Sequence, residues 1–157
     1  MNTYSIQKNN FLISTDKEKL QPDVIHTYLS EESYWAKNIS KQLVLKTIEG
    51  SYCFGMYDIT DNTIAGGKQI GYARVVTDYA TFGYLADVFI LTSFRGMGLS
   101  KWLMQEIMNC PALQGFRRWM LATRDAHGLY EQFGFTPLPD PGRIMQYNPF
   151  TEYPHAL

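Results

Sequence analysis

The passage from Leu85 to Lys101 holds the residues best suited to bind a phosphate group. An apolar run, LADVFIL, leads into a short loop with Arg95, Gly96 and Gly98, and an amphipathic stretch follows directly. Glycines tolerate unusual backbone angles and carry no Cβ, so the chain can approach a diphosphate closely. A helix that begins here would aim its positive end at the same point. The donors would be the backbone N–H groups of Gly96, Met97, Gly98, Leu99 and Ser100, with the Arg95 guanidinium beside them.

Other readings of this loop stay open. The pattern RGxG alone is also typical of an ordinary strand-to-helix turn, or of a site for another nucleotide phosphate such as ATP. A dinucleotide-binding GxGxxG motif does not occur, because Lys101 stands where the third glycine would be.

Asp87 lies inside the apolar run, where an unpaired charge would be costly. Its carboxylate therefore needs a partner, water or a function. It could act as a general base that takes a proton from an amine, directly or through water. Alternatively, it is structural and hydrogen-bonds to neighbouring backbone or to an arginine such as Arg74.

The spacing of apolar residues and breakers predicts the elements that must position these groups. The expected strands are one or two within 4–14, then 52–59, 69–77, 85–91, 119–123, and a final hairpin of 135–138 with 144–147. The expected helices are 22–29, a second from an N-cap at Ser40 to Gly50, 98–109 and 126–133. Turns are expected at Asp61-Asn62, at Gly66-Gly67 and over 78–83.

This order predicts an α/β (α+β) fold with a mixed, mostly antiparallel central sheet and helices on both of its faces. No linker rich in Pro, Gly or Ser divides the chain, so residues 1–157 are expected to form a single domain.

Composition argues against several classes of protein. A formal net charge of −1 is unlike that of a nucleic-acid binder. No apolar run approaches the ~20 residues that a membrane span needs. Cys53 and Cys110 form no CxxC pair, so free thiols and a cytoplasmic location are expected. His26, His127 and His155 show no metal-binding spacing, so no metal is expected.

Two motifs resemble those of the GNAT superfamily of N-acetyltransferases. Residues 95–100, RGMGLS, are similar to its pyrophosphate loop, Gln/Arg-x-x-Gly-x-Gly/Ala, although Ser100 departs from the last position. Residues 126–135, AHGLYEQFGF, resemble its A-x-x-L-Y-x-x-x-G-F signature. The likeness covers most of the chain. It implies a GNAT-like domain with a coenzyme-binding core at about 85–135 and an acceptor side at about 20–60.

The resemblance implies that acetyl-CoA is the co-substrate and that Tyr130 is the general acid. A phenol, with an ordinary pKa of about 10, is protonated at neutral pH and can protonate the departing thiolate. The pantetheine arm would bind exposed backbone of the strand before the loop. Thr123 stands where many members carry Asn, so that contact would come from a hydroxyl. The implied coenzyme-binding residues are Val88, Phe89, Ile90, Leu91, Arg95, Gly96, Met97, Gly98, Leu99, Ser100, Thr123 and Ala126.

The implied activity is transfer of an acetyl group to a primary amine of a small molecule, by direct attack in a ternary complex. Tyr34 and Trp35, beside Glu31 and Glu32, would border the acceptor pocket and could receive a cation. Core aromatics beside a solvated charge pair are the alternative. The protein would act as a monomer or homodimer. The alternative function is a non-catalytic CoA-binding sensor or interaction module, for which Ser100 and Thr123 leave room.

Overall fold

The computed structural model describes residues 1–60 and 63–154. Its centre is one six-stranded sheet in which the strands lie in the order of the chain. β1 to β5 pair antiparallel with their neighbours, whereas β6 runs parallel to β5. The strands are β1 (Ser5–Lys8), β2 (Phe11–Ser14), β3 (Tyr52–Asp58), β4 (Lys68–Thr77), β5 (Phe82–Ile90) and β6 (Arg118–Met120). The predicted mixed, mostly antiparallel sheet is therefore confirmed.

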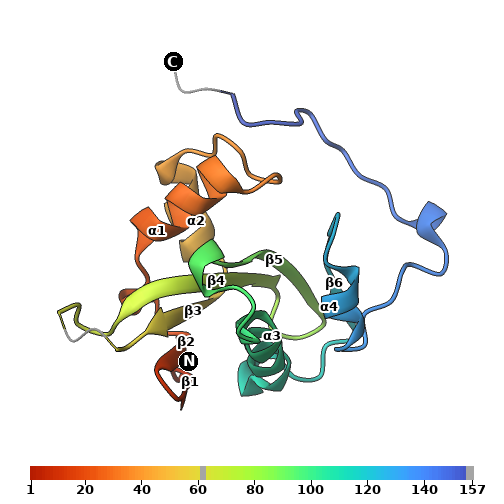
Figure 1. The fold of residues 1–157 in the computed structure, drawn as a ribbon. Helices are drawn as coiled ribbons and strands as arrows, with labels where there is room; N and C mark the ends of the chain where they lie inside the picture. The colour runs from red at the N-terminus through yellow and green to blue at the C-terminus, as the bar shows by residue number, and fades with distance from the viewer. Residues whose placement is uncertain (61–62, 155–157) are drawn as a thin grey trace.

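Helices cover both faces of this sheet, as predicted (Figure 1). On one face lie α1 (Pro22–Thr27), its π-helical continuation (Tyr28–Glu32) and α2 (Lys41–Glu49). α3 (Leu99–Asn109) lies on the other face, and α4 (His127–Glu131) lies beside β6. The predicted N-cap of α2 is confirmed, because the Ser40 hydroxyl accepts a hydrogen bond from the Leu43 N–H at 3.2 Å.

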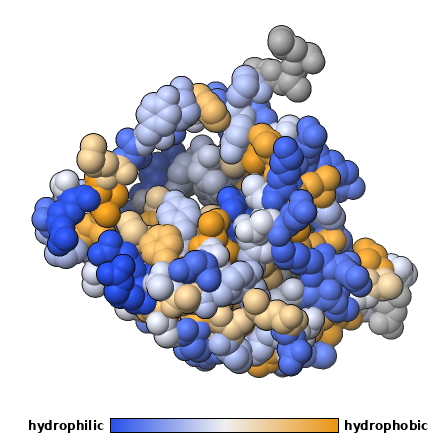
Figure 2. Space-filling model, turned by 180° about the vertical axis from the view of Figure 1, so that it is seen from behind, coloured by the Kyte–Doolittle hydropathy of each residue, from blue (hydrophilic) through white to orange (hydrophobic). Residues whose placement is uncertain are grey.

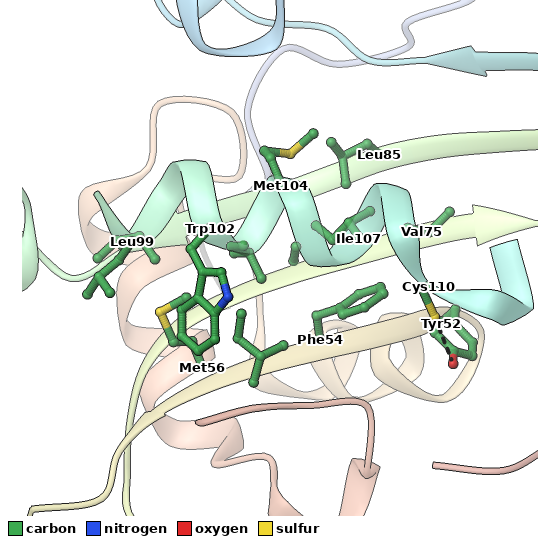
Figure 3. Close-up of a cluster of buried hydrophobic side chains, with 14 of the residues drawn as sticks. Tyr52, Phe54, Met56, Val75, Leu85, Leu99, Trp102, Met104, Ile107 and Cys110 are labelled. Atoms are coloured by element: carbon green, nitrogen blue, oxygen red, sulfur yellow. Dashed lines mark hydrogen bonds between the residues drawn. The ribbon is translucent and has the colours of Figure 1, made fainter. Parts of the chain in front are cut away.

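Each face of the sheet buries its own hydrophobic core. Below the sheet, α3 places an apolar stripe on the inner residues of β3 to β5 (Figure 3). The labelled members of this first core are Tyr52, Phe54, Met56, Val75, Leu85, Leu99, Trp102, Met104, Ile107 and Cys110. The second core joins α1 and α2 to Tyr72 and Phe89 on the opposite face. β5 contributes to both cores, with Leu85 and Ile90 in the first and Phe89 in the second.

The predicted final hairpin is wrong. No strand occurs in residues 135–138 or 144–147, and the only regular piece there is a 3-10 turn, Pro141–Arg143. Prolines at 137, 139 and 141 remove backbone donors that a ladder would need. The last predicted helix is also shorter, ending at Glu131. The predicted turn at Gly66-Gly67 is confirmed by φ values of 83° and 89°, whereas Asp61-Asn62 lies outside the described residues.

Candidate active site

A cleft opens where β5 and β6 part. The two strands pair only from Phe82 with Arg118 to Tyr84 with Met120, and β5 then continues alone to Ile90. The space between them is a cleft of about 540 Å³. Its walls come from β5 (84–88), the segment after β6 (121–126), α4 and residues 34–39. The cleft therefore lies between the expected coenzyme side and the expected acceptor side of the chain.

A β-bulge places Asp87 in this cleft. Between β4 and β5, Ala73 alone faces two residues, Asp87 and Val88, and Asp87 has a φ of 54°. Such bulges re-aim side chains at functional sites. The Asp87 carboxylate accepts from Arg74 Nε at 2.5 Å and from Trp35 Nε1 at 2.8 Å. The carboxylate thus has the arginine partner that the structural alternative requires, and base catalysis by Asp87 stays a prediction.

Tyr130 lines the same cleft from α4. Its side chain is buried, and its ring meets Phe135 edge-on at 6.1 Å. Burial, with the neighbouring Tyr34 and Asp125, raises the pKa of Tyr130 to about 12. Within residues 1–60 and 63–154 its hydroxyl makes no hydrogen bond. A protonated phenol faces the cleft at any physiological pH.

The glycine loop has the conformation that its sequence predicts. Gly96 and Gly98 have φ values of 80° and 76°, and a Cβ on either would meet nothing within 4 Å. Gly98 is the N-cap of α3, so the N–H groups of Gly98, Leu99 and Ser100 have no acceptor inside the helix. Open space beside unsatisfied donors is the geometry that an anion requires.

The Arg95 side chain, which was expected to contact a phosphate, instead makes two hydrogen bonds within the protein. Its Nε donates to the Ile90 carbonyl at 3.1 Å and its Nη2 to the Tyr28 hydroxyl at 2.9 Å. The guanidinium therefore joins the loop to the π-helical turn, and its contact with phosphate stays a prediction. Tyr28 in turn stacks on Phe89, with ring centroids 3.9 Å apart.

The other expected coenzyme residues lie on both sides of the opening. Val88 lines the cleft, whereas Phe89 and Ile90 point to opposite cores and Leu91 packs partly against both. The Thr123 hydroxyl accepts from the Ala126 N–H at 3.0 Å, which ties the turn before α4. Thr123 and Ala126 both line the cleft, and Met97 is 58% exposed at the loop tip.

Tyr34 and Trp35 reach the cleft from the segment between α1 and α2. Their rings meet edge-on at 5.0 Å. The Tyr34 hydroxyl accepts from the Arg124 N–H at 2.9 Å, and the Arg124 guanidinium lies 4.0 Å from the Tyr34 ring centroid. These contacts join the acceptor side to the segment after β6 across the cleft.

Several residues of the cleft were not predicted from the sequence, and three of them have large polar or aromatic side chains. Arg124, Tyr84 and Tyr153 all line it. Tyr84 belongs to the last residue pair between β5 and β6. No local sequence pattern indicates where these two strands separate. Tyr153 belongs to a segment without periodicity, and Arg124 is identifiable only from its stacking on a residue 90 positions earlier.

The described residues hold neither a cluster suited to a metal ion nor a helix suited to spanning a membrane. In residues 1–60 and 63–154 no three His, Cys, Asp or Glu side chains are grouped so as to hold a metal ion. No helix in that part of the chain is both long and apolar enough to cross a membrane.

Comparison with known proteins gives a consistent result. Residues 49–137 match the family model described as the GNAT acetyltransferase domain. A candidate acetyltransferase from Gibberella zeae is 36% identical in an alignment 138 residues long, which covers 78% of this chain and 77% of the relative.

Solved structures agree with the sequence matches. A candidate GNAT-family acetyltransferase from Xanthomonas campestris pv. campestris has a TM-score of 0.82 at 45% identity, covering 90% of this chain and 95% of that one. A candidate acetyltransferase from Clostridium acetobutylicum, solved with acetyl-CoA, has a TM-score of 0.62 at 12% identity and covers 94% and 95% of the two chains, which shows a shared fold alone. From the family match and the 36%-identical relative, the chain belongs to the GNAT acetyltransferase family.

Proposed function

We propose that the protein transfers an acetyl group from acetyl-CoA to a primary amine of a small molecule. The observation that carries this proposal is the cleft between β5 and β6, which brings Tyr130 beside the strand expected to bind the thioester. The glycine loop at the start of α3 supplies donors for the diphosphate at the end of the same strand. The solved relative with acetyl-CoA shares this fold.

In the proposed reaction the amine nitrogen attacks the thioester carbonyl carbon within a ternary complex. The C–N bond forms, the C–S bond breaks, and the leaving thiolate takes the proton of Tyr130. The amine nitrogen loses one proton to Asp87 or to water, and solvent returns a proton to the Tyr130 phenolate. Backbone near Val88 to Ile90 would polarise the carbonyl oxygen, and positioning of the two substrates supplies the rest. Cys53 and Cys110 are buried outside the cleft, which favours direct attack over a covalent acyl-enzyme.

The proposed role of Asp87 has two forms. As a base, its carboxylate would take the amine proton. As a positioning residue, it would orient Arg74 and Trp35, which it contacts now. A pH–rate profile separates them, because Asp87→Asn abolishes the rise of the rate with pH only if the carboxylate is the base.

Calorimetric titration with acetyl-CoA, with ATP as the control ligand, tests the proposal together with an amine panel. Micromolar binding specific to acetyl-CoA, followed by transfer to an amine, is the expected result. Binding without transfer to any amine would instead identify a non-catalytic coenzyme A-binding module. Absence of binding by folded protein would make the glycine loop a structural turn.

A further inference from the structure

The C-terminal segment, residues 136–154, crosses the mouth of the cleft. It leaves the body near α4 and ends on the side of α1 and α2 (Figure 1). Seen from behind, it arches over a hollow in the surface (Figure 2). Its hydrogen bonds within the described chain are local, such as Arg143 N–H to the Asp140 carbonyl at 3.2 Å. Side-chain packing, rather than backbone pairing, must therefore fasten this segment to the body.

Tyr153 is the side chain that anchors the C-terminal end of this segment to the body of the protein. Most large apolar groups of the segment face solvent: Met145 is 93% and Tyr147 is 90% exposed. Tyr153 is half-buried, packs against the second core and lines the cleft. It also lines a second hollow beside α1 and α2, and Ile39 borders both spaces as well. The Tyr153 side chain thus lies between the two spaces, on the outer side of the cleft.

The cleft is aromatic and has no surplus of charge. Five rings border it, from Tyr34, Trp35, Tyr84, Tyr130 and Tyr153. Its charged residues are two arginines and two aspartates, Arg74, Arg124, Asp87 and Asp125. A polycationic acceptor would need an excess of carboxylates, and a phosphorylated one an excess of cations. Neither excess exists here, whereas flat aromatic walls suit an apolar body.

We propose that the acceptor is a primary amine on an aromatic or apolar body, and that Tyr153 is the outer wall that grips this body. The inference rests on the proposed acetyl transfer and adds the substrate class and a specificity-determining residue outside the GNAT motifs. Loss of the Tyr153 ring should weaken binding of the acceptor but not of acetyl-CoA, because the coenzyme is expected to lie along β5 and the glycine loop. Tyr153→Phe keeps that contact, since the hydroxyl makes no hydrogen bond within the described chain.

Steady-state acetyl transfer at saturating acetyl-CoA tests this inference with 2-phenylethylamine, spermidine and glucosamine 6-phosphate as acceptors. We expect kcat/KM to be at least about tenfold higher for 2-phenylethylamine than for the other two. Tyr153→Ala should raise the KM for 2-phenylethylamine about tenfold, while kcat and the KM for acetyl-CoA stay within about twofold of the wild-type values. Tyr153→Phe should restore the wild-type KM. Tyr147→Ala is the matched control, a tyrosine of the same segment that faces solvent, and should behave as wild type.

The outcomes separate the two proposals. Preference for spermidine or the sugar phosphate, or an unchanged KM in Tyr153→Ala, would overturn this inference and leave acetyl transfer standing. Equal effects of Tyr153→Ala and Tyr147→Ala would also overturn it. Absence of transfer to any amine by protein that binds acetyl-CoA would remove the proposed function and this inference with it.

Discussion

Replacement of Asp87 should cost more stability than replacement of an aspartate in an exposed ion pair. The Asp87 side chain is 7% exposed and its partner Arg74 is 18% exposed. Asp87→Asn keeps the size and can still accept from Trp35, but it presents a neutral amide to the Arg74 guanidinium. That cation then stays largely desolvated without a counter-charge. Breaking a buried pair in this way costs about 3–5 kcal/mol, and the residual solvent contact of Arg74 favours the low end, about 3 kcal/mol.

Asp23 supplies the matched control. It also forms an ion pair, with Lys41, but the two side chains are 84% and 50% exposed. Water replaces that partner readily, so Asp23→Asn should leave the unfolding midpoint within experimental error. Arg74→Gln on the Asp87→Asn background should recover part of the loss, because the double variant buries no unpaired charge.

Urea unfolding at pH 7, followed by circular dichroism, measures these differences. The expected loss for Asp87→Asn corresponds to a fall in Tm of roughly 6–12 °C for a chain of this size. A loss no greater than that of Asp23→Asn would refute the reasoning, since the Asp87–Arg74 pair would then behave as a solvated surface pair.

Three further predictions concern other parts of the molecule. Gly98→Ala should cost about 1 kcal/mol in urea unfolding because of its φ of 76°, whereas Gly128→Ala in α4 has room and no positive φ and should be neutral; equal effects would contradict the strain argument. A thiol reagent should label neither Cys53 nor Cys110 in native protein and both in guanidinium, since both are buried and burial raises the pKa of the Cys53 thiol. The raised pKa of Tyr130, about 12 against an ordinary 10, favours folding below pH 10 and loses that contribution as the pH rises from 10 to 12. The free energy of unfolding, measured with urea between pH 10 and 12, should therefore fall less steeply with pH for Tyr130→Phe than for wild type. Equal slopes would contradict the raised pKa of Tyr130.

The sequence predicts the parts of the fold that have local causes. A serine that can cap a helix and a glycine after its last turn define α2 from Ser40 to Gly50. Two glycines between an apolar strand and an amphipathic stretch define the loop before α3, and both have the positive φ that makes glycine necessary there. The motif around Tyr130 likewise places that residue on a short helix beside the sheet.

The remaining features depend on contacts between distant segments. The bulge at Asp87 comes from the register of β4 against β5, which no residue type nearby specifies. The stacking of Arg124 on Tyr34 forms only after the sheet has brought both to one cleft. Ile144 to Tyr147 have the composition of a strand. The preceding prolines lack the backbone N–H groups that a partner strand would need, so the predicted hairpin does not form. Tyr153 has no motif, and only its place in the folded chain identifies it.

In the proposed reaction Tyr130 protonates the thiolate that leaves acetyl-CoA, with the coenzyme bound between β5 and β6. A single-turnover experiment tests it most directly: protein loaded with acetyl-CoA is mixed with the best amine of the panel, and release of free coenzyme A is timed by rapid quench. Tyr130→Phe should release coenzyme A at least about 100-fold more slowly than wild type, with acetyl-CoA binding unchanged within about twofold. Release at the wild-type rate by Tyr130→Phe would contradict the claim.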